Sequence, residues 1–130
     1  MYYILKSDGT HLNEVDGWVE THELERNIEP TLPAALEKAG VEFAILSDET
    51  MAVVYLPMSV GSCVAYGLSW GAGIRAITIN AAKMLQISDR TGSIEKGKDA
   101  DIAFFDGDPL LNKSRCLGTM IDGVIYDREF

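Results

Sequence analysis

Asp48, His11 and His22 are the side chains considered first as candidates for binding a metal ion or transferring a proton. Asp48 follows a nearly continuous apolar run, residues 41–46, and therefore stands at the carboxy-terminal end of the strand that this run predicts. A carboxylate there either takes part in chemistry or accepts hydrogen bonds from the following turn, and the residues alone leave both readings open. The two histidines lie in a polar, acidic segment, where histidines more often face solvent than bind metal.

Two further patterns suggest binding sites but are explained more simply. Residues 71–76 fit the dinucleotide-binding pattern G-x-G-x-x-A, yet the preceding residues 66–70 do not form a convincing strand, so the required strand–turn–helix frame is missing. An acidic run suggests calcium by residue type, but its spacing is not that of an EF-hand, and strand and turn positions account for it. The run comprises Asp99, Asp101, Asp106 and Asp108.

Composition excludes several classes of partner. The chain has 130 residues, 47% of them hydrophobic, which predicts one globular unit with its own core. A net charge of −9 leaves no basic surface for nucleic acid or anionic lipid. No apolar run approaches the roughly 20 residues of a membrane helix, and the amino terminus does not resemble a signal peptide, so we expect a cytoplasmic protein that binds no membrane. Cys63 and Cys116 match no metal-ligand spacing and are expected to be reduced.

The elements that would position Asp48 follow an α/β order. Thr31 and Pro33 predict the start of a helix that Gly40 ends. The apolar run after it predicts a parallel strand covered on both faces, since such strands lack polar alternation. A second helix is expected over residues 57–67, and Ser69 is expected to cap a third helix whose apolar positions continue to residue 85. Helices alternating with a strand predict α/β packing.

Beyond Asp89 the apolar period changes from helical to alternating, which predicts small β-hairpins. Lys96-Gly97 marks the turn of the first hairpin, and Asp122-Gly123 marks the turn of the second. We therefore predict two parts, an α/β portion over residues 1–90 and a β portion over residues 91–130.

Three stretches of this sequence resemble the carboxy-terminal end of the metal-dependent amidohydrolases, in particular their imidazolonepropionase-like branch. They are AGVEFAILSDE at residues 39–49, AITINAAKML at residues 76–85 and GSIEKGKDADI at residues 92–102. The resemblance runs from about residue 23 to residue 126. It implies the last βα elements of a TIM-type barrel, followed by carboxy-terminal strands of a composite β-sandwich. Such barrels need about 250 residues, so only part of one is expected here.

The resemblance also implies a function. In the family, the aspartate that matches Asp48 closes a site for one or two divalent metals, zinc being the expected one, and moves a proton between water and the leaving nitrogen of a C–N bond. A metal lowers the pKa of water, and a nearby carboxylate then accepts and returns the proton. The family's other ligands cannot be placed in this sequence. We therefore expect Asp48 to be a catalytic and metal-site residue only in a complete barrel, and expect the isolated chain to hold no metal and to be inactive.

Two kinds of partner follow from these expectations. A missing amino-terminal barrel portion would complete the active site. Alternatively, the chain is a non-catalytic interaction module that covers its exposed strand edges and apolar faces by forming a homo-oligomer. The sequence departs from close relatives at Glu49-Thr50, where His-Pro is common, and at residues 69–73, where an acidic helix start is common. These departures weaken the inheritance of the catalytic role.

Overall fold

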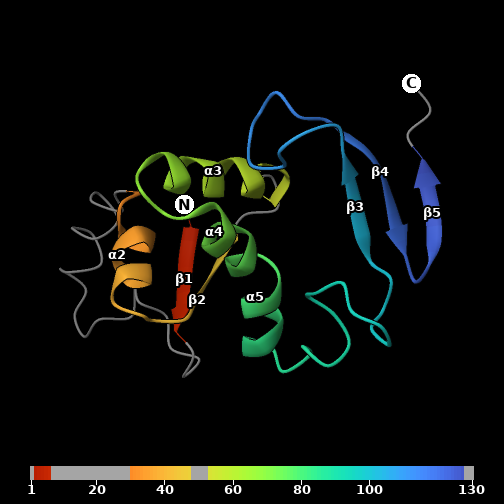
Figure 1. Ribbon diagram of the computed structural model, residues 1–130, viewed down its shortest axis with the longest axis horizontal. Helices are drawn as coiled ribbons and strands as arrows, with labels where there is room; N and C mark the ends of the chain where they lie inside the picture. The colour runs from red at the N-terminus through yellow and green to blue at the C-terminus, as the bar shows by residue number, and fades with distance from the viewer. Residues whose placement is uncertain (1, 7–29, 48–52, 128–130) are drawn as a thin grey trace.

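The structure is a computed structural model that describes residues 2–6, 30–47 and 53–127 (Figure 1). It contains both helices and strands, which confirms the α/β class. The helices gather round the β1–β2 pair, and the β3–β4–β5 sheet stands beside them (Figure 1). In chain order the elements are β1 (Tyr2–Lys6), α2 (Leu32–Lys38), β2 (Phe43–Ser47), the 3-10 helix η1 (Val53–Tyr55), α3 (Leu56–Ala65), α4 (Trp70–Ala76), α5 (Ile79–Met84), β3 (Ile102–Phe105), β4 (Cys116–Ile121) and β5 (Val124–Asp127).

Helix α2 begins and ends where its local sequence requires. Pro33 lies in the first turn, where its missing N–H removes no helical hydrogen bond. Gly40 has a φ of +69°, and the N–H groups of Gly40 and Val41 donate to the carbonyls of Glu37 and Leu36, both at 3.0 Å. These two bonds form a Schellman motif, which satisfies the last carbonyls of the helix and turns the chain into β2.

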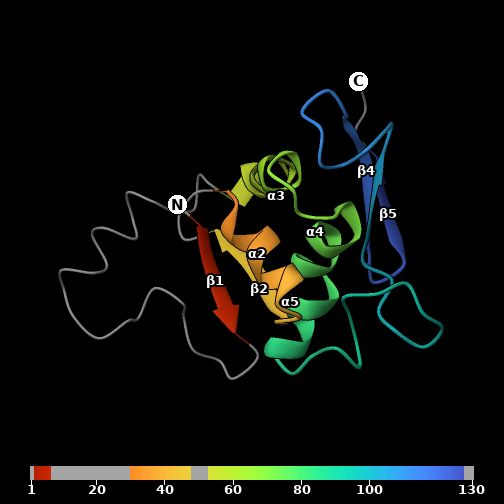
Figure 2. The ribbon, with the colours of Figure 1, turned by 60° about the vertical axis from the view of Figure 1, so that its left-hand side comes forward.

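Strand β2 is the buried centre of the helical part. Phe43, Ala44 and Ile45 are 3%, 1% and 2% exposed. Its described neighbour β1 runs antiparallel to it, with Ile4 opposite Ile45, and lies on the outer side of the group in Figure 2. The prediction of a parallel strand is therefore wrong for this pairing. A strand edge accepts backbone hydrogen bonds from a strand of either direction, so burial alone did not fix the orientation.

The predicted long helix after Ser69 is two short helices. Helix α4 ends at Ala76, and α5 begins at Ile79. Between them Thr78 has φ −130° and ψ −101°, and its hydroxyl donates to the Ile74 carbonyl at 2.7 Å. A threonine hydroxyl that bonds to the preceding turn competes with the helical hydrogen-bond ladder, which explains the break.

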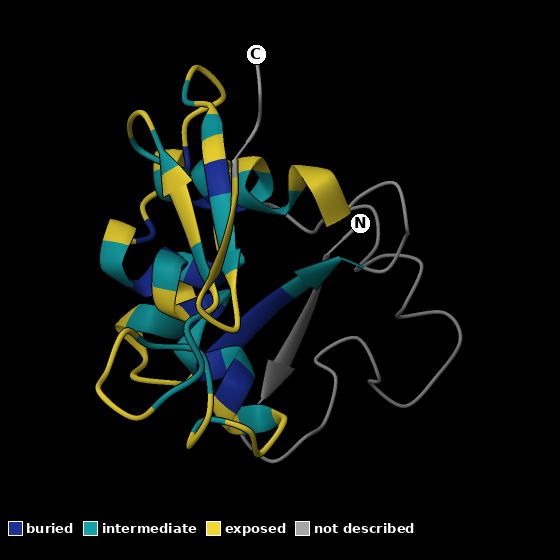
Figure 3. Cartoon of the chain, turned by 90° about the vertical axis from the view of Figure 1, so that its right-hand side faces the viewer, coloured by how far each residue is buried: buried dark blue, intermediate teal, exposed yellow. Residues whose placement is uncertain are grey.

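The hydrophobic core joins β2 to α3 and α4 and also receives one residue of the β portion. Val60 and Cys63 of α3 are 0% and 1% exposed, and Leu110, from the loop between β3 and β4, is 4% exposed. Helices α3 and α4 approach closely at Gly73, because a Cβ there would lie 2.8 Å from Val60 Cγ1. The burial view shows this core on β2 and the helices (Figure 3).

Strands β3, β4 and β5 form an antiparallel sheet in that order. The hairpin predicted at Asp122-Gly123 is confirmed: both residues have positive φ, 49° and 78°, as a type I′ turn requires. The turn at Lys96-Gly97 is also present, but no strand is described over residues 91–100, and Ile94 is 83% exposed. The first predicted hairpin is therefore wrong, because its apolar residue finds no neighbouring element to pack against.

The two cysteines, Cys63 and Cys116, are free thiols, as predicted. Within the described ranges, no helix combines the length and apolar character needed to cross a bilayer. The division of the chain at residue 90 stays a prediction.

Candidate functional site

Asp48 follows the last residue of β2 directly, since the strand ends at Ser47. Asp48, His11 and His22 lie outside the described residues, so their side chains are not placed. The structure does describe β2, the strand that precedes Asp48, and the helices that pack against this strand.

The start of β2 is fixed by a buried amide. Asn80, on α5, is 9% exposed, and its Nδ2 donates to the Phe43 carbonyl at 3.0 Å. This bond joins residues 37 positions apart in the chain. A buried hydrogen bond of this kind is costly to lose, because the buried carbonyl would lose this donor without gaining water in its place. Asn80 thus ties α5 to the strand that leads to Asp48.

The amino terminus of α4 is occupied by groups of the chain itself. The Ser69 hydroxyl accepts a hydrogen bond from the Ala72 N–H at 3.1 Å, which confirms Ser69 as the cap. The Ser69 N–H and hydroxyl in turn donate to the two oxygens of Glu37, at 2.8 and 2.5 Å. These bonds, with a smaller effect of the Arg75 charge, hold the pKa of Glu37 below its ordinary value.

The second glycine of the G-x-G-x-x-A pattern, Gly73, therefore has a structural explanation. Gly73 permits the close approach of α3 and α4, and a carboxylate already accepts hydrogen bonds at this helix end. The amino terminus of α4 is therefore occupied by a carboxylate of the protein itself, Glu37.

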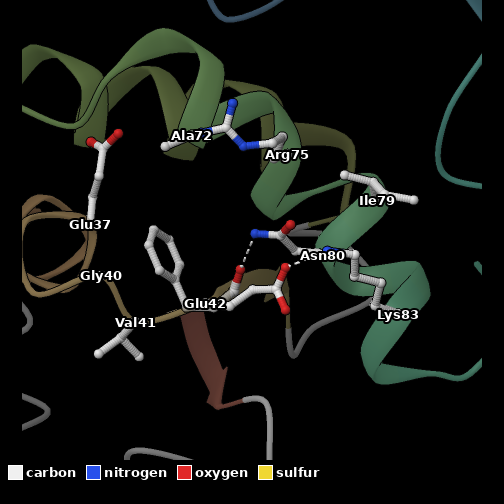
Figure 4. Close-up of a pocket in the computed structure, with 10 residues that line it drawn as sticks. Glu37, Gly40, Val41, Glu42, Ala72, Arg75, Ile79, Asn80 and Lys83 are labelled. Carbon is white, nitrogen blue, oxygen red and sulfur yellow. Dashed lines mark hydrogen bonds and ion pairs between the residues drawn. The ribbon is translucent and has the colours of Figure 1, made fainter.

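A cavity of about 350 Å³ lies between the α2–β2 connection, α4 and α5 (Figure 4). Its lining includes two carboxylates, Glu37 and Glu42, and two cations, Arg75 and Lys83. The Lys83 ammonium pairs with Glu42 at 2.6 Å. Phe43 and Asn80 contribute to the same lining. The chain thus brings charged groups from three separate elements to one hollow at the start of β2.

The four aspartates of the acidic run each have a structural partner. Asp99 pairs with Arg90 at 2.7 Å, and Asp101 accepts the N–H of Asp122 at 2.9 Å. Hydrogen bonds from the Arg115 backbone N–H and guanidinium lower the pKa of Asp106. The Trp70 indole and then the Leu110 N–H do the same for the pKa of Asp108. These contacts explain the run through strand and turn structure, as predicted.

The described residues do not supply a metal site. Among them, no three His, Cys, Asp or Glu side chains come together in a way that would hold an ion. The Cys63 thiol is buried, and this burial raises its pKa, which disfavours the thiolate that metal binding or nucleophilic attack requires. The described residues alone therefore do not form a metal site of three or more such ligands.

A model of the amidohydrolase family matches residues 6–126. The chain belongs to the amidohydrolase family. Among solved structures, an amidohydrolase from Thermotoga maritima superposes with a TM-score of 0.71 at 34% identity, over 76% of this chain and 26% of that one. Because the identity is well above the level at which only the fold is shared, the structural likeness and the family match support each other.

Curated relatives agree with the expected branch of this amidohydrolase family. The imidazolonepropionase of Picrophilus torridus is 36% identical over 96 residues, which covers 65% of this chain and 24% of the relative. The imidazolonepropionase of Maricaulis maris is 33% identical over 76 residues, which covers 55% of this chain and 19% of that relative. Adenine deaminase 2 of Jannaschia sp. is 31% identical over 96 residues, which covers 70% of this chain and 15% of that relative. The predicted resemblance is confirmed, and the chain spans a quarter or less of the length of these curated relatives.

Sequence reasoning missed the cavity residues Arg75 and Asn80. A signal for Asn80 was present, because it is a polar residue at an apolar position of the helical pattern, beside Ile79 and Ala81. A polar residue buried at such a position must find a hydrogen-bond partner. No comparable signal marked Arg75, since an arginine on a helix is ordinary.

Proposed function

We propose that this chain provides the carboxy-terminal barrel elements and sandwich strands of a metal-dependent amidohydrolase that hydrolyses C–N bonds. Residues 1–90 would form the barrel part, and residues 91–130 the sandwich part. The family match over residues 6–126 is the observation that carries this proposal. The bond cleaved, in an amide, a cyclic amide or a dipeptide, follows from the resemblance to the imidazolonepropionase-like branch.

Asp48 is the residue that we assign to proton transfer. Its place directly after β2 supports this role, because catalytic residues of barrel enzymes stand at the carboxy-terminal ends of strands. A divalent metal, zinc by resemblance, would supply a water of lowered pKa in the complete protein. Asp48 accepts a proton from the attacking water and returns it to the leaving nitrogen. The Asn80–Phe43 hydrogen bond fixes β2, the strand that Asp48 follows.

The remaining metal ligands would come from an amino-terminal barrel portion. That portion is either part of a longer form of this protein or a separate polypeptide. Stable metal sites need about three or more protein ligands in fixed positions, and a single carboxylate does not meet this need. The 130 residues alone are therefore proposed to be inactive.

Reconstitution tests the proposal. The chain is mixed with zinc and the separately expressed amino-terminal barrel portion of the Picrophilus torridus imidazolonepropionase, and hydrolysis of cyclic amides and dipeptides is measured. Activity should require both polypeptides and the metal, and Asp48→Asn should lower it by about a thousandfold or more, since it removes the proton acceptor. Asp89→Asn, at an exposed turn, is the matched control and should leave activity unchanged. Full activity of Asp48→Asn would show that the assigned role is wrong.

A second candidate function is a non-catalytic module that associates with itself. It is supported by the outer sheet, where Ile121, Val124, Ile125 and Tyr126 are all more than half exposed. β5 is an edge strand of its sheet, and an exposed edge strand with apolar side chains favours pairing with another chain. Sedimentation over a range of concentrations should then show an oligomer, and zinc analysis should show no stoichiometric metal. A stable monomer that retains one zinc per chain would contradict this candidate.

A further inference from the structure

We propose that the cavity between the α2–β2 connection, α4 and α5 binds a small monocarboxylate that also carries a hydrogen-bond donor, in particular a short hydroxy acid. Its volume of about 350 Å³ lies within the range of small-molecule sites. Phe43, which lines it, begins β2, whereas Asp48 follows the last residue of that strand. The proposed site is thus at the opposite end of β2 from the catalytic aspartate and does not depend on the proposed function.

Arg75 is the group that selects a carboxylate. The other charged groups of the lining are engaged: Glu37 accepts two hydrogen bonds from Ser69, and Lys83 pairs with Glu42. No described carboxylate forms an ion pair with Arg75. In Figure 4 its side chain lies on α4 at the edge of the hollow. A guanidinium presents its donors as a planar fork that matches the two oxygens of a carboxylate.

Asn80 adds a second requirement on the ligand, which is a hydrogen-bond donor. Its Nδ2 is used by the Phe43 carbonyl, while its amide oxygen accepts no hydrogen bond from any described group. Since no fully buried side-chain polar atom of the described chain lacks a partner, this oxygen keeps some contact with solvent, and Asn80, which is 9% exposed, lines the cavity. An amide oxygen only accepts hydrogen bonds. The ligand should therefore bring a hydroxyl, ammonium or N–H donor in addition to its carboxylate.

The remaining lining restricts the charge and size of the ligand. Val41, Phe43 and Ile79 give the cavity apolar walls, which suit a short carbon chain between the two polar ends. Glu37 and Glu42 would repel a dianion, so a monocarboxylate fits better than a phosphate. The chain's net charge of −9 opposes any anion only weakly at a distance, since salt screens charges over about 8 Å.

Titration of the full chain followed by NMR tests the proposal. The probes are glycolate, 3-hydroxypropionate and 4-hydroxybutyrate, each compared with its neutral amide and with chloride at equal ionic strength. At least one acid should shift the Arg75 guanidinium and Asn80 amide signals with saturation, with a Kd on the order of 1 mM. Arg75→Gln should weaken binding about tenfold or more. Arg90→Gln, which removes an exposed arginine paired with Asp99, is the matched control and should have no effect.

Three results would overturn the proposal. One is the absence of a saturating shift with every acid. Another is equal shifts with chloride or with the neutral amides, which would show a general ionic or solvent effect. The third is unchanged binding by an Arg75→Gln chain whose circular dichroism and signal dispersion match those of the parent. If an acidic peptide binds while none of the small acids does, the first of these results holds and the cavity is assigned to a protein partner instead.

Discussion

Replacing Gly61 by alanine should detach the β3–β4 loop from the helical core. Gly61 lies in the middle of α3, and a Cβ there would be 2.1 Å from the Leu110 carbonyl oxygen. Real Cβ atoms essentially never come closer than 3.0 Å to such a neighbour, so the Leu110 backbone must retreat by about 0.9 Å. Because the contact is with backbone, no change of side-chain rotamer relieves it.

The size of the effect follows from two opposing terms. Leu110 is 4% exposed, and withdrawing a buried leucine side chain from the core costs about 1.5–3 kcal/mol. Alanine is favoured over glycine inside a helix by about 1 kcal/mol, which offsets part of the loss. The expected net fall in the free energy of unfolding is therefore about 0.5–2 kcal/mol.

Urea unfolding followed by circular dichroism measures this fall, and the Trp70 indole N–H resonance reports the loop, since that indole donates to Asp108 at 2.9 Å. The matched control is Gly71→Ala in α4, where the nearest described atom outside the helix backbone is the end of the flexible Arg75 side chain at 3.2 Å. It should be neutral or slightly stabilising. If Gly61→Ala were as stable as the parent with an unshifted Trp70 resonance, the inferred docking of Leu110 would be refuted.

Three further changes test other contacts. Asn80→Ala leaves the Phe43 carbonyl buried without its donor and should lower the free energy of unfolding by about 1–3 kcal/mol in urea titration, whereas an unchanged midpoint would contradict the anchoring of β2. Ser69→Ala removes the cap of α4 and should cost about 1 kcal/mol by the same measurement, with Ser69→Asn losing less. Asp108 has a pKa lowered in the folded state, so it stabilises the fold above its unfolded pKa of about 3.9, and this stabilisation is lost as the pH falls through the lower folded pKa. The unfolding temperature of the parent should therefore fall between pH 6 and pH 2 more steeply than that of Asp108→Asn, which lacks this carboxylate. Identical plots of unfolding temperature against pH for the two proteins would refute the role of the carboxylate.

Features that depend on a few neighbouring residues were predicted well from the sequence. Gly40 ended α2, Ser69 capped α4, and Asp122-Gly123 formed the turn of the last hairpin. Each depends on the backbone angles or the hydrogen bonds of residues within about four positions. The family motifs are likewise contiguous stretches, so the resemblance to the amidohydrolases is visible in the order of the amino acids alone.

Features that depend on distant parts of the chain were decided by the tertiary structure. The antiparallel partner of β2 is β1, in which Ile4 lies opposite Ile45, and both α4 and α5 pack against β2. The cavity brings together Glu42, Arg75 and Asn80, which no local pattern relates. Apolar periodicity indicates which face of an element is buried, but it does not identify the neighbouring element, because the hydrophobic effect is non-directional. The sequence by itself therefore determined the family and the local turns and caps, whereas only folding decided which polar groups meet across the core.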